Sequence, residues 1–474
     1  MPRAVAQPHP LLPLYKREVT KINFNVILRH AKKTSFLKTV SNVLKCDQKI
    51  TKMLSNSDLI ELFTFWSIIQ STLSSNEDEH LSTPFFDSVS IESINVEDSL
   101  DMPPPGLLRM DLTGQLRRTM IYHVVKSSKR SIVCSPLSAL LPLGKLMMGS
   151  SSRNHQELKN ATGYSRSRVD DNFFEVIDRL TYMNGNVQLS IASRLYVSDK
   201  YQLNPAFDAK VKAVFESSCE RVDFLRPQKT AELINDWVRQ KTKGMINSLV
   251  EPNQISITTS LLITNAIYFH GLWKNSFTYQ NLEPFKAPGQ DINIEMMTTE
   301  ARFNYTKNHK YAVEIIQIPY SGDEVSFVIV LPFENRNVDT FLCKTLAAPE
   351  TWNMLFESMV ETRLALTIPK FVTSTKLDLN KIYKKVGLKD IFEKDNSVLT
   401  KVLSKQKIYV SESIHVAVIE VDEKSSKASA TKLISSFSDG NARPRTTEVV
   451  VNRPFVYFVV ANTEQLFAGF YNGL

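Results

Sequence analysis

The sequence predicts an α+β domain with a largely antiparallel sheet. Apolar positions recur at helical spacing in the first part of that domain, and long runs rich in β-branched and aromatic residues dominate its second part. The sequence has no regular alternation of strands and helices of the kind that predicts a parallel sheet. With 43% hydrophobic and 22% charged side chains, the 474-residue chain has the composition of a globular protein with a large core.

A predicted extension, residues 1–106, precedes this domain, which we place at residues 107–474. The extension is basic at first, then acidic and rich in proline, which is typical of a linker. An apolar run at residues 59–73, "LIELFTFWSIIQSTL", is too short for a good membrane span and contains Glu61. It is either a signal sequence, if translation starts at Met53, or an amphipathic helix.

Helices are predicted first along the domain. Residues Leu116–Lys129 have apolar side chains at helical spacing. Residues Ser135–Gly163 contain two short helices, and the first has Ser135 as its N-cap and Pro136 in its first turn. A further helix, Lys229–Gly244, ends at a glycine. Its apolar face is predicted to consist of Leu233, Ile234, Trp237 and Val238.

Strands dominate after the predicted helix Lys229–Gly244, with one more helix, Leu377–Leu388, among them. The predicted strands are Thr258–Trp273, Tyr311–Tyr320, Glu324–Pro332, Arg363–Phe371, Ser413–Val421 and Val449–Val460.

Sequence signatures of enzymatic chemistry are missing. The chain has no GxSxG, HExxH, Walker or GxGxxG motif, and its eight histidines never lie four residues apart. Its four cysteines are widely spaced and predict neither a disulfide framework nor a zinc site. The basic segment near the N-terminus lacks the aromatic residues that a nucleic-acid surface needs. We therefore expect no enzyme activity, no cofactor, no metal and no nucleic-acid partner.

The connection between the last two predicted strands is unusual. The stretch "EKSSKASATKLISSFSDGNARPRTTE", Glu423–Glu448, separates two strong strand signals, although such connections usually take two to six residues. Small and polar side chains alternate in its first half, which would suit either an exposed segment or an added strand. Gly440 and Pro444 mark an exposed turn, where proteases cut most readily. The alternative is an ordinary flexible hairpin loop.

The sequence resembles the serpins, a family of serine protease inhibitors, from about Leu107 to Leu474. The matching segments occur in the family's order, and it is their order that makes the resemblance specific. They are "SPLS", "LMMGSSSRNHQEL", "SRLYV", "VDF", "INDWVRQKTKGMI", "TNAIYFHGLWKNSF", "EIIQIPY", "LTIPKF", "GLKDIF", "SIHVAVIEVDE" and "RPFVYFVV".

The resemblance implies the serpin fold, with three β-sheets, about nine α-helices and an exposed reactive-centre loop. In this family a serine protease attacks the loop and forms an acyl-enzyme, and the cut loop then inserts into the main sheet as a new strand. The residues that let the sheet open match Ser135, Ser138, Asn265 and His415, and Trp273 matches the tryptophan where insertion starts.

The hinge at the start of the loop departs from the family pattern. It comprises Glu423, Ser425, Ser426, Ala428, Ala430 and Lys432. Ser425 stands where the family has glycine, which stiffens the hinge. Alternation points Lys432 into the sheet, and burying an unpaired ammonium is costly.

The family's loop length predicts the reactive bond. Seventeen residues counted from Glu423 place it between Asp439 and Gly440. The alternatives are the bond between Arg445 and Thr446 and, for a chymotrypsin-like protease, the bond between Phe437 and Ser438.

The leading hypothesis is a secreted, extracellular serine protease inhibitor, acting as a monomer on a target serine protease. The alternative is a non-inhibitory serpin that serves as a binding, carrier or precursor protein. Two sequons, at Asn160 and Asn304, agree with secretion. The net charge of +8 admits a polyanion such as heparin as a partner. The basic residues considered for it are Arg117, Arg118, Lys126, Lys129 and Arg130.

Overall fold

The computed structural model describes most of the second of two units of the chain, Asp101–Leu474. The described residues are 114–126, 130–150, 155–164, 187–336, 341–342, 345–346, 350–395, 397, 399–404, 406–424, 446–461 and 463–474. The predicted extension, with its apolar run 59–73, and most of the long connection, residues 425–445, lie outside them.

Helices dominate the beginning of the described chain, as the periodicity predicts. The α-helices are α6 (Gln115–Lys126), α7 (Pro136–Gly149), α8 (His155–Thr162), α10 (Pro205–Phe215), α11 (Pro227–Lys241), α13 (Glu350–Glu357) and α14 (Leu379–Lys385). Short 3₁₀ turns lie at Pro252–Gln254 and Asp390–Phe392. The predicted cap is confirmed, because the Ser138 backbone N–H donates to the Ser135 hydroxyl at 3.1 Å.

The strands form two hydrogen-bonded sheets in the described part of the chain. The larger sheet has the order β1-β14-β13-β8-β7-β6-β9-β12, with β5 paired to β6. Its strands are β1 (Ile132–Cys134), β5 (Thr278–Ala287), β6 (Gln290–Asn308), β7 (Val313–Pro319), β8 (Val325–Pro332), β9 (Val360–Pro369), β12 (Thr447–Val450), β13 (Phe455–Ala461) and β14 (Glu464–Tyr471).

The smaller sheet has five strands in the order β10-β11-β4-β2-β3. They are β2 (Val187–Ser198), β3 (Glu220–Val222), β4 (Leu261–Gly271), β10 (Phe371–Asp378) and β11 (Val410–Val421). The α+β class is thus confirmed. Two sheets are found in the described part of the chain instead of the expected three. The 19-residue strand β6 pairs with β5 and β9 along one part and with β7 at its end, and it thereby joins all these strands into one sheet.

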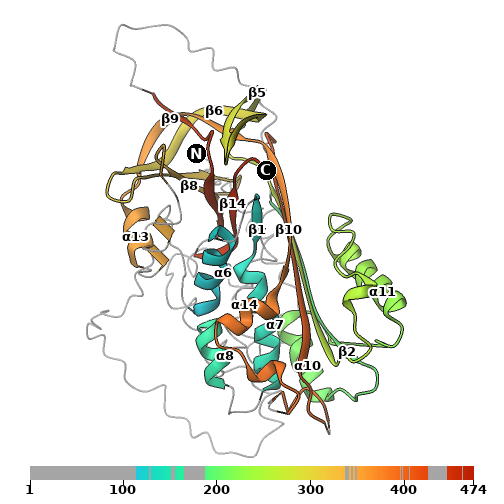
Figure 1. Ribbon diagram of the computed structural model, residues 1–474. Coiled ribbons are helices and arrows are strands. Elements are labelled where there is room, and N and C mark those ends of the chain that lie inside the picture. Colours follow the sequence, from blue (N-terminus) through green and yellow to red (C-terminus); the bar gives the residue numbers. More distant parts are fainter. Residues whose placement is uncertain are drawn as a thin grey trace, which may run out of the picture. The chain divides into compact units, whose positions relative to one another are not determined.

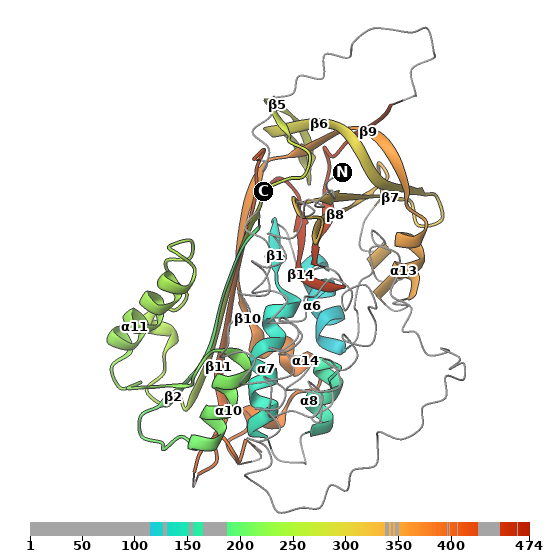
Figure 2. The same cartoon turned by 180° about the vertical axis from the view of Figure 1, so that it is seen from behind.

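The five-stranded sheet has helices on both faces, as the two opposite views show (Figures 1 and 2). Helix α7 is buried along its whole length and contacts β2 and β4 on one face. Helix α11 covers the other face, where Ile234 and Val238 pack into a cluster with Tyr268 and Val416. None of the described helices is both long and apolar enough to cross a membrane.

Two predictions about single elements are wrong. Leu233 of α11 is 39% exposed rather than part of the apolar face, because the buried side of the helix runs through Thr230, Ala231, Ile234 and Val238. The predicted strand Val449–Val460 is two strands, β12 and β13, because the chain leaves the edge of the sheet before Pro454, which has no N–H to donate, and re-enters it in the middle.

Candidate functional site

The ladder between β4 and β11 is parallel and lies in the middle of the five-stranded sheet. It runs from Val410 opposite Leu261 to Glu420 opposite His270, while the outer neighbours β2 and β10 pair with it antiparallel. A strand that followed β11 after one reversal of direction and lay between β4 and β11 would run antiparallel to both.

A buried polar cluster lies beneath the centre of this ladder. His415 and Asn265 are opposite each other in the register, and the N-terminus of α7 brings Ser135 and Ser138 against them. The Ser135 N–H donates to His415 Nε2 at 3.2 Å, and the Asn265 carboxamide lies 3.1 Å from both His415 Nδ1 and the Ser138 hydroxyl. All four residues are fully buried. The structure thus brings together the four residues predicted to let the sheet open, which we call the latch.

The latch binds β4 and β11 to α7 without any charge. Burial lowers the pKa of His415 to about 3, so its ring is neutral at physiological pH. Nε2 accepts a backbone N–H and therefore has no proton of its own, which leaves the proton on Nδ1, and Nδ1–H can donate to Asn265 only when the carboxamide turns its otherwise unpaired oxygen toward the ring. Separation of the two strands would break the contact between His415 and Asn265, so this cluster opposes opening until it rearranges.

Trp273 lies just beyond β4, at the end of the β4–β11 ladder. Its backbone N–H donates to the Lys424 carbonyl at 3.0 Å, its indole N–H donates to the Asp422 carbonyl, and its ring stacks on Tyr320 with centroids 4.4 Å apart. Glu423, the one predicted hinge residue among the described residues, forms an ion pair with Lys370 at 3.0 Å. These contacts bind the residues after β11 to the end of the sheet.

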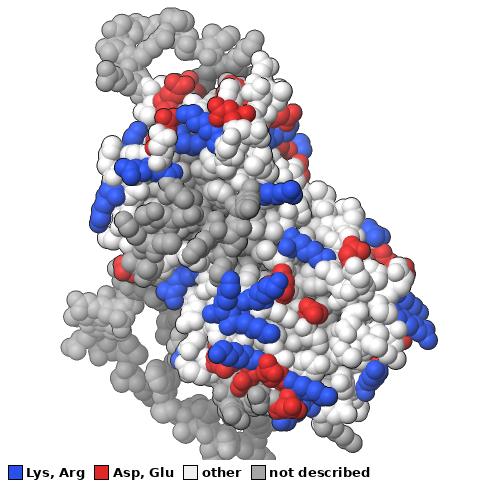
Figure 3. All heavy atoms as spheres, in the orientation of Figure 1, with Lys and Arg blue, Asp and Glu red and all other residues white. Residues whose placement is uncertain are grey.

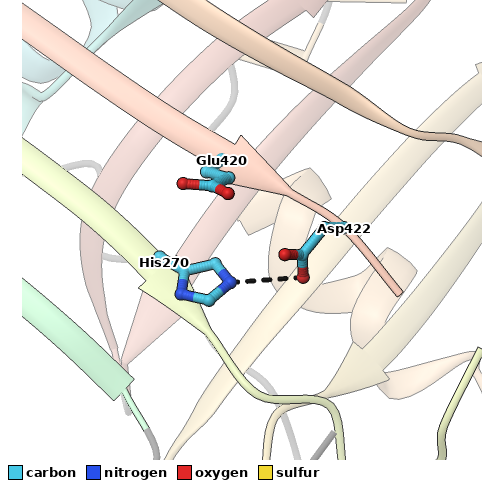
Figure 4. A group of neighbouring side chains, drawn as sticks. All are labelled: His270, Glu420 and Asp422. Carbon is cyan, nitrogen blue, oxygen red and sulfur yellow. Dashed lines mark hydrogen bonds and ion pairs between the residues drawn. The ribbon is translucent and has the colours of Figure 1, made fainter. Parts of the chain in front are cut away.

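A second polar group at this end was not predicted from the sequence. His270 of β4, Glu420 at the end of β11 and Asp422 just after it place their side chains together on one side of the sheet (Figure 4). His270 Nε2 lies 3.2 Å from an Asp422 oxygen, and the Tyr268 hydroxyl donates to Glu420 at 2.8 Å. Only the spacing of Glu420 and Asp422, two residues apart on a strand, hints at this grouping in the sequence.

The long connection joins the two sheets. Strand β11 belongs to the five-stranded sheet, whereas β12 pairs in parallel with β9 at the edge of the larger sheet. The alternative of an ordinary hairpin loop is therefore wrong. At the far end, the Thr446 hydroxyl donates to Glu300 at 3.2 Å. The other predicted residues of the connection lie outside the described residues, namely Ser425, Ser426, Ala428, Ala430, Lys432, Phe437, Ser438, Asp439, Gly440 and Arg445.

The predicted polyanion surface needs one correction. Arg117 is fully buried and pairs with Glu464 at 2.9 Å, so it is not available to a partner. Arg118 is half-buried and Arg130 is exposed, and the side chains of Lys126 and Lys129 lie outside the described residues.

Comparison with known proteins agrees with this architecture. The family model described as serpin (serine protease inhibitor) matches residues 114–472. The chain is 30% identical over 357 residues to antichymotrypsin-2 and to antitrypsin, both of Bombyx mori, covering 74% of this chain and 95% and 91% of theirs. The crystal structure of native protease nexin-1 with heparin matches with a TM-score of 0.66 and 26% identity, over 75% of this chain and 97% of that one.

The fold is thus the one that the matching serpin structures share. The chain belongs to the serpin family of serine protease inhibitors.

Proposed function

We propose that this protein inhibits a serine protease as a suicide substrate. The protease attacks the connection after β11, its serine forms an ester with the new C-terminus, and the new N-terminus leaves as an amine. The cut segment then inserts between β4 and β11 and carries the protease with it. No residue of the inhibitor itself needs to be catalytic.

The parallel β4–β11 ladder supports this proposal most directly. Insertion of one strand replaces a single parallel ladder by two antiparallel ones, and antiparallel pairing is slightly more stable per residue. An inserted strand of about a dozen residues gains on the order of 10 kcal/mol from its backbone hydrogen bonds alone. Insertion is therefore downhill once cleavage frees the segment, and the latch around His415 controls how fast it occurs.

For the reactive bond we propose Asp439–Gly440. It lies sixteen residues beyond Glu423, which the ion pair with Lys370 fixes at the end of the sheet. The alternative bond, Arg445–Thr446, is directly next to β12, and the hydrogen bond from Thr446 to Glu300 holds its second residue against the sheet. A protease needs an extended segment that is free on both sides of the bond, which favours Asp439.

The test is to incubate the full chain with an aspartate-specific serine protease, trypsin and chymotrypsin. We expect a complex that survives denaturing electrophoresis, and mass spectrometry of the released C-terminal peptide identifies the bond. Asp439→Ala should abolish the complex with the aspartate-specific enzyme, whereas Arg445→Ala, the matched control, should leave it unchanged. The opposite pattern with trypsin would assign the reactive bond to Arg445.

Thermal melting separates inhibition from the alternative of a non-inhibitory serpin, which Ser425 and Lys432 favour. Cleavage without a complex but with a large rise in Tm means that the segment inserts too slowly to trap the protease. Cleavage with neither a complex nor a rise in Tm would refute the proposal and leave a binding or carrier role.

A sulfated polyanion is the partner we propose in addition to the protease. Lys and Arg side chains gather on the face where α14 lies (Figure 3), and the last turn of α14 contains Lys384 and Lys385, both exposed. The related protease nexin-1 was crystallised with heparin. Added heparin should accelerate complex formation, and Lys384→Ala with Lys385→Ala should reduce that effect while basal inhibition stays unchanged.

We propose that the protein is secreted and that it is glycosylated at Asn160 and Asn304. Asn160 is exposed on α8, where Gln156 donates to it at 2.8 Å. Asn304 is half-buried on β6 and donates to Gln317 at 3.1 Å. We therefore expect higher occupancy at Asn160. Glycosidase digestion of protein from a eukaryotic secretory host, followed by peptide mass spectrometry, measures both.

A further inference from the structure

The group formed by His270, Glu420 and Asp422 lies exactly at the point where the proposed insertion would begin. His270 and Glu420 are opposite each other at the last paired position of β4 and β11, and Asp422 follows two residues later on the same side. One nitrogen and two carboxylate oxygens, one from each side chain, lie within 4.8 Å of one another. The His270 and Asp422 side chains are only 15% and 6% exposed, so their positions are fixed by packing.

The spacing of the His270 and Asp422 ligand atoms suits a transition-metal ion. A zinc ion bound at 2.0–2.2 Å by nitrogen and oxygen in a tetrahedron places two of its ligand atoms about 3.3 Å apart. The distance from His270 Nε2 to the Asp422 oxygen is 3.2 Å. Three protein ligands with an imidazole and two carboxylates, and a fourth position left for water, form a set that zinc accepts, whereas magnesium and calcium prefer oxygen alone.

The charges also favour a cation. Glu420 accepts a hydrogen bond from the neutral Tyr268 hydroxyl, and the Lys424 ammonium lies 2.8 Å from Asp422. The charge of Lys370 also acts on Asp422, but Lys370 forms its ion pair with Glu423. Among the described residues, a single ammonium thus lies at ion-pair distance from the two carboxylates. The Lys424 side chain is 60% exposed, so it can leave Asp422 when a divalent ion enters.

We propose that His270, Glu420 and Asp422 form a zinc site that joins β4 to β11. A bound ion links two strands through bonds much stronger than the hydrogen bonds it replaces, so it stabilises the closed sheet and slows strand insertion. The regulatory part of this inference rests on the proposed function, whereas the metal site itself does not.

Calorimetric titration of the full chain with Zn²⁺ tests the site. We expect wild-type protein to bind at least tenfold more tightly than His270→Gln, because a ligand is lost. The matched control is His309→Gln, which removes an exposed histidine of the β6–β7 turn and should bind like the wild type. Lys424→Met should bind about fivefold more tightly, because the competing ammonium is gone. Equal affinity of wild type and His270→Gln would overturn the proposal.

A second measurement covers the regulatory part. Zn²⁺ should raise the Tm of the intact wild type but not of His270→Gln, and it should slow the appearance of the heat-stable cleaved form, with Mg²⁺ as the control ion. Zinc affinity that depends on His270, in a chain that gains no heat stability on cleavage, supports the metal site and refutes the proposed function instead. Zinc that binds through His270 without slowing insertion would overturn the regulatory part.

Discussion

His415 shows how one buried ring can hold two strands and a helix. Its Nε2 accepts the N–H of Ser135, and its Nδ1 faces Asn265, so both ring nitrogens are used when the ring is neutral. A protonated ring would carry a proton on Nε2, pointed at the N–H of Ser135, and would place a charge in a fully buried site. Removal of the ring from water disfavours this charged form, and burial thus lowers the pKa of His415 to about 3.

The pKa of His415 predicts how stability depends on pH. Between pH 6.5 and about 3 the unfolded chain binds a proton at this residue and the folded chain does not, so the stabilisation present above pH 6.5 is lost as the pH falls. The free energy of unfolding should fall by about 1.4 kcal/mol per pH unit in this range from this group alone. Urea denaturation of wild type and His415→Gln measures the difference, and parallel curves would contradict the prediction.

Lys145 is a second buried titratable residue, and the sequence did not indicate it. It lies in the middle of α7, is fully buried, and donates to the Ser193 carbonyl of β2 at 2.6 Å. Burial lowers its pKa to about 7. Ser193 also accepts from the Ser217 hydroxyl at 2.9 Å, so its carbonyl keeps a partner when Lys145 is replaced.

Replacement of Lys145 by methionine should stabilise the protein. The unfolded chain keeps a proton on this residue up to pH 10.5, whereas the folded chain loses it above about pH 7, so the free energy of unfolding of the wild type rises between these values. Lys145→Met should remove that rise and add about 1–3 kcal/mol at pH 7 and below. Chemical denaturation at pH 7 and pH 10 checks this, and an unchanged or lower stability at pH 7 would refute it.

The segment after β11 must match the two strands that it would separate. Alternation points Ser426, Ala428, Ala430 and Lys432 to one face, and Lys427 to the other. In an inserted strand the small side chains would fit between β4 and β11, whereas burying the Lys432 ammonium would cost several kcal/mol unless it reaches solvent.

Lys432→Thr should therefore improve inhibition. If the ammonium raises the barrier to insertion by about 1.4 kcal/mol, its removal makes insertion tenfold faster relative to release of the cleaved chain. The number of inhibitor molecules consumed per protease molecule should fall accordingly. Lys427→Thr removes the same charge from the opposite face and should have little effect, and equal effects of the two variants would contradict the assigned alternation.

Local signals predicted most of the helices and about half of the strands in the described part of the chain, but not how distant elements meet. Ser135 as a cap, the run of β4 and the β-branched run of β11 follow from short-range preferences. The grouping of His270 with Asp422 depends on the register of two strands whose residues are 152 positions apart, and packing of the whole sheet sets that register. Leu233 shows the same limit, because the helical period alone does not decide which flank of a helix meets the sheet.

The latch residues Ser135, Ser138, Asn265 and His415 were predicted from family resemblance, and the structure gives the contacts between them. The sequence contains no local signal for this cluster, since its members come from three separate elements.

The order of the larger sheet has a consequence for how the chain is made. Strands β13 and β14 are the last to be synthesised, yet they lie between β1 and β8, and β1 has β14 as its neighbour. On the ribosome, the larger sheet cannot be completed until the final residues emerge, whereas β4, β11 and the segment after them are already available. Under the proposed mechanism, β12, β13 and β14 would therefore have to pair before the uncut segment inserts between β4 and β11, because an uncut segment that inserted early would no longer be offered to a protease.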